Sequence, residues 1–388
     1  MTPPALGVGL IGVGWMGRLH GVAYRRVRYH YPHLAYTPRL VVASDTSDER
    51  VGFAVRELGY ETGTADWREV VKHPDVDVVS ITAPNFLHEQ MALAAAEAGK
   101  HVWIEKPLGR GLAETAAIEH AVRTAGVFSA VGFNYRHAPC VAYARELVAS
   151  GGIGRVTHAR GAFLNDYAAE PKGALSWRFR RAYGGSGALG DLMSHAVDLL
   201  QYVLSPVRSV CAQVDTFIPQ RPVPPAGAST HFAVVEDGTL APVENEDYAG
   251  SLVRFESGAS GMLEASRATV GPRCGLGFDI HGTSGAVSWD FERMNEVRVC
   301  LGRSGPAHGY TTVHVNADHG DYAAFQPGPT ISMSYDDLKV IEAALLLRSI
   351  ATGKQVGPHV GDALSAARVV DAMETSARSE RWERVEQP

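Results

Sequence analysis

Three glycines near the start of the chain have the spacing of a phosphate-binding turn. Gly12, Gly14 and Gly17 form a Gly-x-Gly-x-x-Gly pattern directly after the apolar run 6–11. The first glycine allows a tight turn, the second lets backbone N–H groups approach a pyrophosphate, and the third lets helix and strand pack closely. The pattern predicts a dinucleotide site, and a plain glycine turn is the alternative.

A carboxylate follows the second apolar run of the chain. Asp45 comes directly after residues 40–44. A carboxylate at this point can accept both ribose hydroxyls of NAD. The distance from Gly17 is longer than usual, and a loop rich in Tyr, His and Pro at 29–38 can absorb the excess. The alternative is a capping or turn aspartate.

An acid and a base lie four residues apart in a mostly apolar segment, 189–204. Asp191 and His195 would share one face of a helix. Histidine ordinarily titrates near neutral pH and can accept a proton, and the carboxylate can bind a hydroxyl or hold the imidazole. Burying polar groups on an apolar helix costs free energy unless they have partners, which favours a functional role. A solvated helix contact remains the alternative.

The elements that must position these groups differ between the two halves of the chain. Short apolar runs alternate with helix-like segments up to about residue 138, which predicts βαβ units and a doubly wound parallel sheet. Beyond it, strands are expected near 155–164, 249–268, 276–280, 286–291 and 296–301, and helices near 141–149, 189–204, 337–350 and 361–377. We therefore expect an α/β Rossmann domain at 1–138. An α+β domain with an open, mostly antiparallel sheet should follow at 139–388.

Three further segments match a known family. They are Thr82-Ala83-Pro84-Asn85 with His88, Glu105-Lys106-Pro107, and Gly190-Asp191 with His195. With the glycine turn, they resemble the glucose–fructose oxidoreductase/inositol dehydrogenase/MocA (Gfo/Idh/MocA) family of sugar and cyclitol dehydrogenases. Segments 133–136, 175–179 and 185–191, and the insertion before Asp45, resemble an anhydrosugar dehydrogenase of this family most closely. The match departs at 165–167, where Asn-Asp-Tyr replaces a glutamine and a tryptophan flanking the aspartate.

The resemblance implies a mechanism. Lys106 would be the family's catalytic lysine, before what is often a cis proline, and Asp191 and His195 would complete the catalytic set. An ammonium at Lys106 can stabilise a developing alkoxide, and His195 can take the hydroxyl proton while a nicotinamide takes the hydride. The nicotinamide would lie between the domains.

The expected site residues fall into two groups. Cofactor contacts are expected from Gly12, Gly14, Trp15, Met16, Gly17, Asp45, Ala83, Pro84, Asn85, His88, Glu105, Lys106, Asn134, Trp177 and Arg178. Substrate contacts are expected from Lys106, Tyr135, Arg136, Asn165, Asp166, Asp191, His195 and Tyr335. A capping role is the alternative for Asn85, and a surface position for Arg178. Tyr335 and Lys339 have the spacing of a short-chain dehydrogenase pair but lie outside the Rossmann half, so we expect Lys339 on a helix surface.

These observations predict an NAD-dependent dehydrogenase that oxidises a secondary ring hydroxyl of a sugar, anhydrosugar or cyclitol to a ketone. An inositol dehydrogenase and an NADP-dependent sugar-ketone reductase are the rivals among enzymes. A catalytically silent NAD(P)-binding regulator is the rival of another class. Retention of Lys106, Asp191 and His195 together favours an enzyme.

Composition excludes several other classes. The chain has 388 residues, 45% hydrophobic and 20% charged, which argues against disorder and coiled coils. The net charge of −6 without a long basic block argues against nucleic-acid binding. No apolar run approaches the roughly 18 residues of a membrane span. Four scattered cysteines lack zinc-site spacing and fit a reducing compartment. We expect a cytoplasmic homodimer or homotetramer, associated through the C-terminal sheet, with no metal.

Overall fold

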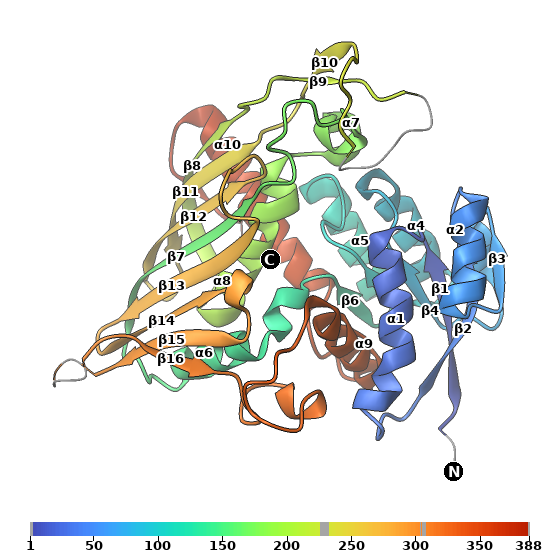
Figure 1. The fold of residues 1–388 in the computed structure, drawn as a ribbon, viewed down its shortest axis with the longest axis horizontal. Helices are drawn as coiled ribbons and strands as arrows, with labels where there is room; N and C mark the ends of the chain where they lie inside the picture. Colours follow the sequence, from blue (N-terminus) through green and yellow to red (C-terminus); the bar gives the residue numbers. More distant parts are fainter. Residues whose placement is uncertain (1–2, 226–232, 303, 305–307, 387–388) are drawn as a thin grey trace. The chain divides into compact units, whose positions relative to one another are not determined.

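A computed structural model describes residues 3–225, 233–302, 304 and 308–386 of the chain, which divides into two units (Figure 1). Unit 1 comprises Met1–His137 and Met333–Leu364, and unit 2 comprises Ala138–Ser332 and Ser365–Pro388. The structure differs from the expectation at 333–364, which belongs to unit 1 because helix α9 (Tyr335–Thr352) packs against helix α1 (Trp15–His30).

Unit 1 is built on a six-stranded parallel sheet with the strand order β3-β2-β1-β4-β5-β6. Its strands are β1 (Ala5–Ile11), β2 (Thr37–Ser44), β3 (Thr62–Thr64), β4 (Val78–Ile81), β5 (His101–Ile104) and β6 (Ser129–Val131). The strands β1, β4 and β5 are short apolar runs that are almost wholly buried on both faces, as is typical of parallel sheets. The order reverses between β1 and β4, and in such sheets ligands bind outside the carboxyl ends of the strands at this reversal. The predicted Rossmann fold is confirmed.

Helices connect these strands or follow the last of them. The connecting helices are α1, α2 (Asp48–Phe53), the π-helix η1 (Ala54–Leu58), α3 (Trp67–Lys72), α4 (Asn85–Glu97) and α5 (Leu112–Ala125), and the 3₁₀ turn η2 (Asn134–His137) and α9 come after β6. The start of α9 is fixed by a capping box between Ser334 and Asp337. Asp337 also pairs with Arg26 of α1 at 2.6 Å, which ties the late helix α9 to the first helix of the unit.

Unit 2 is built on a nine-stranded sheet with the order β16-β15-β14-β13-β7-β12-β11-β8-β17. Its strands are β7 (Val156–Asn165), β8 (Val207–Asp215), β11 (Tyr248–Phe255), β12 (Ser260–Ser266), β13 (Cys274–Gly282), β14 (Gly285–Asp290), β15 (Glu296–Leu301), β16 (Thr311–His314) and β17 (Glu383–Arg384). Strands β7 and β12 are parallel and the other neighbouring strands are antiparallel. The predicted open, mostly antiparallel sheet is confirmed.

Helices of unit 2 contact this sheet from one face. Helix α8 (Ser194–Val203) contacts β7, β12 and β13, and α6 (Pro139–Ala149) contacts β14 and β15. The remaining elements are the 3₁₀ turns η3 (Trp177–Phe179), η5 (Phe291–Arg293) and η6 (Tyr322–Ala324), helix α7 (Arg181–Gly184), the π-helix η4 (Leu189–Met193), and the strand pair β9 (Gln220–Pro222) and β10 (Leu240–Pro242). Helix α10 (Val360–Ser379) begins in unit 1 and continues in unit 2 from Ser365. Within the described residues, none of the helices is long and apolar enough to cross a bilayer.

Candidate active site

The three glycines of the glycine turn differ in backbone conformation and in the space around them. Gly12 has a φ of +89°. A Cβ on Gly17 would lie 2.0 Å from the carbonyl oxygen of Gly12, so helix and turn meet closely there. No heavy atom lies within 4 Å of a Cβ built on Gly14. The chain itself therefore does not require glycine at position 14, and the open space suits an approaching phosphate at the N-terminus of α1.

Asp45 braces the same turn. Its Oδ2 accepts a hydrogen bond from the backbone N–H of Val13 at 2.8 Å, and its Oδ1 accepts one from Ser47 at 3.0 Å. The turn-aspartate role is thus present, and a carboxylate still has lone pairs for ribose hydroxyls. The guanidinium of Arg50 lies 3.7 Å from Oδ2.

The segment after β4 lies beside the segment after β5. His88 of α4 is fully buried, with Nε2 2.7 Å from the Ala83 carbonyl oxygen and Nδ1 3.0 Å from that of Pro107. Burial lowers the pKa of this histidine, and the two carbonyls oppose that shift. His88 therefore lies between the two segments, and its neutral ring can donate a hydrogen bond to one of the two carbonyls. Asn85 is the first residue of α4 and Pro84 is its cap, so the capping alternative for Asn85 is not seen.

A buried charge network lies directly before Lys106. Glu105 Oε1 is 3.0 Å from His20 Nε2 and 2.5 Å from Lys339 Nζ, and Lys339 Nζ is 2.8 Å from Glu342 Oε2. The His20 ring stacks on Trp103, with centroids 3.5 Å apart. Lys339 is 0% exposed. Our expectation of a surface position for Lys339 was wrong, because two carboxylates compensate its burial.

Electrostatics within this network keep its main pair ionised. Burial would raise the pKa of Glu105, but the Lys339 ammonium and the His20 hydrogen bond hold it well below its usual value. Burial would lower the pKa of Lys339, but Glu105 and Glu342 raise it well above its usual value. Burial lowers the pKa of His20 to about 4, so His20 donates as a neutral ring.

Lys106 begins the turn that follows β5. It is half-buried, and its peptide bond to Pro107 is cis. In η2, the turn after β6, Asn134 is 1% exposed and its side-chain Nδ2 has no hydrogen-bond partner among the described residues. Such a donor is rare and is suited to a ligand oxygen. Arg136 forms an ion pair with Asp362 of the same unit at 3.1 Å, so its guanidinium has a structural contact.

Aromatic rings meet beside the glycine turn. Trp15 is 66% exposed and stacks on Tyr335, with centroids 5.6 Å apart and planes at 20°. Tyr135 approaches the same Tyr335 ring edge-on at 5.9 Å. The Tyr335 hydroxyl lies 4.0 Å from Met16 Sδ. Four residues predicted to contact cofactor or substrate thus form one cluster.

Asp191 and His195 lie in unit 2, on consecutive helical segments. Residues 189–204 were expected to form one regular helix, but the first turn is the π-helix η4, and α8 begins at Ser194. The Ser194 hydroxyl donates to the Gly190 carbonyl at 2.7 Å, where the two segments join. Isolated π turns are frequent at functional sites. His195 is 5% exposed, and Asp191 Oδ2 accepts a hydrogen bond from the Tyr167 hydroxyl at 2.8 Å.

The other predicted site residues of unit 2 make contacts of different kinds. Asn165 Oδ1 accepts the Tyr167 backbone N–H at 3.0 Å and so forms part of a turn. Asp166 lies 3.7 Å from the exposed Arg273. Arg178 lies over the Trp177 ring at 4.3 Å, within η3.

Sequence reasoning missed three residues next to predicted ones. His20 and Lys339 contact Glu105, and Tyr167 contacts Asp191. The available signals were a lysine directly before the mostly apolar run 340–347 and the unmatched segment 165–167; the sequence around His20 gave none.

Comparisons with known proteins agree with this geometry. Residues 6–133 match the oxidoreductase family with an NAD-binding Rossmann fold, and residues 141–288 match the GFO/IDH/MocA C-terminal domain. The chain is 38% identical to levoglucosan dehydrogenase of Pseudarthrobacter phenanthrenivorans, over 97% of each chain. This chain belongs to the Gfo/Idh/MocA family. The predicted membership and the likeness to an anhydrosugar dehydrogenase are confirmed, and the chain is an NAD-dependent oxidoreductase.

Two further similarities bear on the ligands. A structure of levoglucosan dehydrogenase in complex with NADH and levoglucosan superposes with a TM-score of 0.92 and 36% identity, covering 99% of this chain and 100% of that one. The scyllo-inositol 2-dehydrogenase (NAD(+)) of Bacillus subtilis is 30% identical over 67% of this chain and 69% of its own.

The residues of unit 1 fit a dinucleotide. Gly14 leaves open space at a helix N-terminus, Asp45 supplies a fixed carboxylate at the end of β2, and Asn134 supplies a buried amide donor. Among the described residues, no three His, Cys, Asp or Glu side chains are placed to hold a metal ion.

Proposed function

We propose that this enzyme oxidises a secondary ring hydroxyl of an anhydrosugar such as levoglucosan, or of a related sugar or cyclitol, to a ketone. The observation that carries the proposal is the likeness to levoglucosan dehydrogenase over 97% of both chains. Lys106 after β5 and Asp191 and His195 on successive helical turns supply the acid–base groups that the reaction needs.

NAD⁺ supplies the hydride acceptor for this chemistry. Lys106 holds its ammonium against the hydroxyl oxygen and stabilises the charge that develops as the proton leaves. His195 takes that proton, and Asp191 orients the hydroxyl or the imidazole. Glu105 and His88 fix the main chain on either side of Lys106, through the Lys339 pair and the Pro107 carbonyl respectively.

The preference for NAD over NADP follows from Asp45. Its carboxylate is held at the end of β2 by two backbone N–H groups, where it would accept ribose hydroxyls and repel a 2′-phosphate. The nearby Arg50 favours a second candidate, an NADP-dependent sugar-ketone reductase, because a guanidinium binds phosphate well. Comparing kcat/KM for the two cofactors separates them.

Turnover with a panel of sugars, followed by NADH absorbance, tests the proposal. Levoglucosan, glucose and inositol distinguish the substrate classes, and no turnover with any sugar would favour the silent regulator. We expect Lys106→Ala to lower kcat by roughly 10² or more while NADH still binds, because it removes charge stabilisation of the transition state.

His195→Ala tests the proton acceptor. It should lower kcat by roughly 10²–10⁴ and flatten the rise of oxidation with pH. If both variants melt earlier yet keep near-normal kcat per folded molecule, these residues are structural and the mechanism is refuted.

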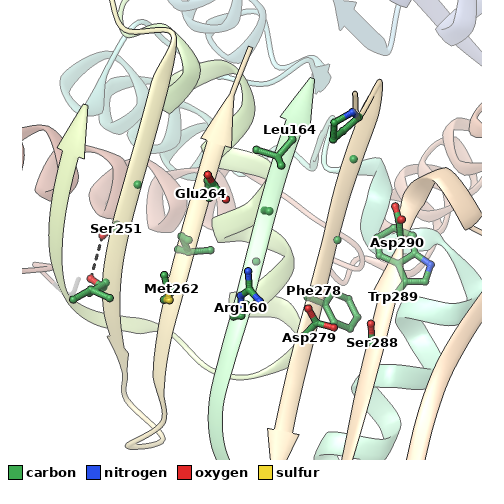
Figure 2. Close-up of a pocket in the computed structure, with 18 of the residues that line it drawn as sticks. Arg160, Leu164, Ser251, Met262, Glu264, Phe278, Asp279, Ser288, Trp289 and Asp290 are labelled. Carbon is green, nitrogen blue, oxygen red and sulfur yellow. Dashed lines mark hydrogen bonds between the residues drawn. The ribbon is translucent and has the colours of Figure 1, made fainter. Parts of the chain in front are cut away.

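The open face of the unit 2 sheet supports the proposed homodimer or homotetramer. This face contains a pocket of about 720 Å³. Figure 2 shows four of the residues that line it, Arg160, Met262, Glu264 and Asp279. Met262 and Leu252 are about half exposed, at 53% and 49%. Sedimentation of wild type and Met262→Asp tests this interface. The free state of all four cysteines fits the proposed cytoplasmic location.

A further inference from the structure

A phenol holds the proposed catalytic carboxylate of unit 2. The Tyr167 hydroxyl donates to Asp191 Oδ2 at 2.8 Å, although the two residues are 24 positions apart. Burial and the Asp191 charge raise the pKa of Tyr167 well above its usual value. The phenol therefore keeps its proton over the whole working pH range and acts only as a donor to the carboxylate.

The ring of Tyr167 is itself fixed. Its backbone N–H is bonded to Asn165 Oδ1, and its ring packs against a buried cluster that contains Ala168, Leu175 and Phe179. A side chain held at both ends has few rotamers to lose when it makes a hydrogen bond. Its hydroxyl is consequently preorganised towards Asp191.

Two buried arginines pack on the Phe179 ring of this cluster and restrict its movement. The guanidinium groups of Arg221 and Arg267 lie 4.3 Å and 4.5 Å from the centroid of the Phe179 ring. Arg267 bonds Asp247 at 2.8 Å, and Arg221 bonds the Glu170 carbonyl at 2.8 Å. Both arginines are at most 1% exposed, and buried cations of this kind are held in one geometry by their partners.

The main chain that carries Asp191 is anchored as firmly. The Leu189 N–H at the start of η4 donates to Glu246 Oε1 at 3.0 Å, and the Asp191 N–H donates to the Gly187 carbonyl at 3.0 Å. A Cβ on Gly187 would lie 2.0 Å from the Glu246 carbonyl oxygen, so the two segments touch there. The backbone contacts fix the main chain of Asp191, and the hydrogen bond from Tyr167 limits rotation of its carboxylate.

We propose that Tyr167 is a positioning residue for the oxidation, which holds the Asp191 carboxylate in one orientation and in its ionised form. This inference rests on the proposed function and adds a residue to it. Among the described groups, the charges of Arg267 and Arg178 act on Tyr167, and His195 lies on the helical turn that follows Asp191.

Tyr167→Phe is the test, because it removes one donor and keeps the ring. We expect kcat/KM for levoglucosan to fall roughly tenfold or more, since hydrogen bonds to charged groups are among the strong ones. The acidic limb of the pH profile should move up by about half to one pH unit, because the carboxylate then holds a proton, or a protonated His195, more tightly. NADH affinity should not change. Tyr143→Phe, whose ring contacts His319 in the same unit, is the matched control and should change none of these.

A double-mutant cycle with Asp191→Asn separates positioning from direct substrate contact. If Tyr167 acts through Asp191, Tyr167→Phe has little further effect in the Asp191→Asn background. An equal loss in both backgrounds, or an unmoved pH limb with less than about a twofold loss, overturns the inference while an active wild type keeps the proposed function. An inactive wild type overturns the proposed function and this inference with it.

Discussion

Replacing Lys339 by methionine removes a cation from between two buried carboxylates. Its Nζ lies 2.5 Å from Glu105 and 2.8 Å from Glu342, whose residues are 7% and 1% exposed. Methionine keeps an unbranched side chain and a high helix propensity, so the substitution isolates the charge. The two carboxylates then remain in a low-dielectric interior without this cation.

The size of the effect follows from the two ways a stranded carboxylate can respond. Removing one partner of a buried ion pair costs about 3–5 kcal/mol. Alternatively the carboxylate binds a proton, which costs about 1.4 kcal/mol per pH unit above its ordinary pKa near 4.3, or about 4 kcal/mol at pH 7.5 and about 1.6 kcal/mol at pH 5.5. His20 contacts Glu105 and can bind the proton instead. The stability loss then also becomes smaller as pH falls. We expect Lys339→Met to lower the free energy of unfolding by about 3–5 kcal/mol near pH 7.5, and by about 1–3 kcal/mol less near pH 5.5.

The wild-type pair contributes almost no pH dependence of its own in this range. The raised pKa of Lys339 gives stability that is fully present below about pH 10.4 and is lost as pH rises towards the folded pKa. The depressed pKa of Glu105 gives stability that is present above about pH 4.3 and is lost as pH falls. Urea unfolding followed by circular dichroism at the two pH values measures the difference, with the exposed Lys354→Met as control. A loss below about 1 kcal/mol, or one equal at both pH values, would refute the reasoning.

Three further substitutions test the cofactor site. Asp45→Ala should lower the preference of kcat/KM for NAD⁺ over NADP⁺ by roughly tenfold or more, since it removes the carboxylate that opposes a 2′-phosphate; an unchanged ratio would contradict that role. Gly17→Ala should destabilise the protein by about 1–3 kcal/mol in thermal unfolding, because its Cβ would meet the Gly12 carbonyl oxygen at 2.0 Å. Gly14→Ala should leave the melting temperature unchanged, because its Cβ meets nothing within 4 Å, yet weaken NADH binding in a fluorescence titration. Equal effects of the two alanines on stability and binding would contradict the separate roles.

Features set by neighbouring residues could be predicted from the sequence. The glycine turn and the Glu105-Lys106-Pro107 segment depend on a few consecutive side chains, and the strand–helix alternation depends on local hydrophobic spacing. The structure confirms the fold that these patterns predicted. Their physical causes act within one turn or one strand, so the pattern and the cause lie in the same window of sequence.

Features set by distant partners could not be predicted. Glu105 and Lys339 are 234 residues apart, and lysine is almost never buried unless it is paired, so the burial of Lys339 depends on a partner that the local sequence does not reveal. Helix α9 is buried on nearly all sides and shows no amphipathic stripe, so its pattern does not reveal its neighbours. The return of residues 333–364 to unit 1 was missed for the same reason.

Each unit therefore fixes one proposed catalytic group through a buried contact from a distant part of the chain, and the two contacts should fail differently. Lys339 neutralises carboxylates inside unit 1, so its loss should appear mainly as lost stability. Tyr167 only orients a carboxylate whose main chain is already anchored by Glu246, so its loss should appear mainly as lost rate. Electrostatic catalysis depends on groups that are oriented before the reaction begins. A Tyr167→Phe enzyme that melts like wild type but turns over slowly, beside a Lys339→Met enzyme with the opposite behaviour, would separate orientation from folding in this site.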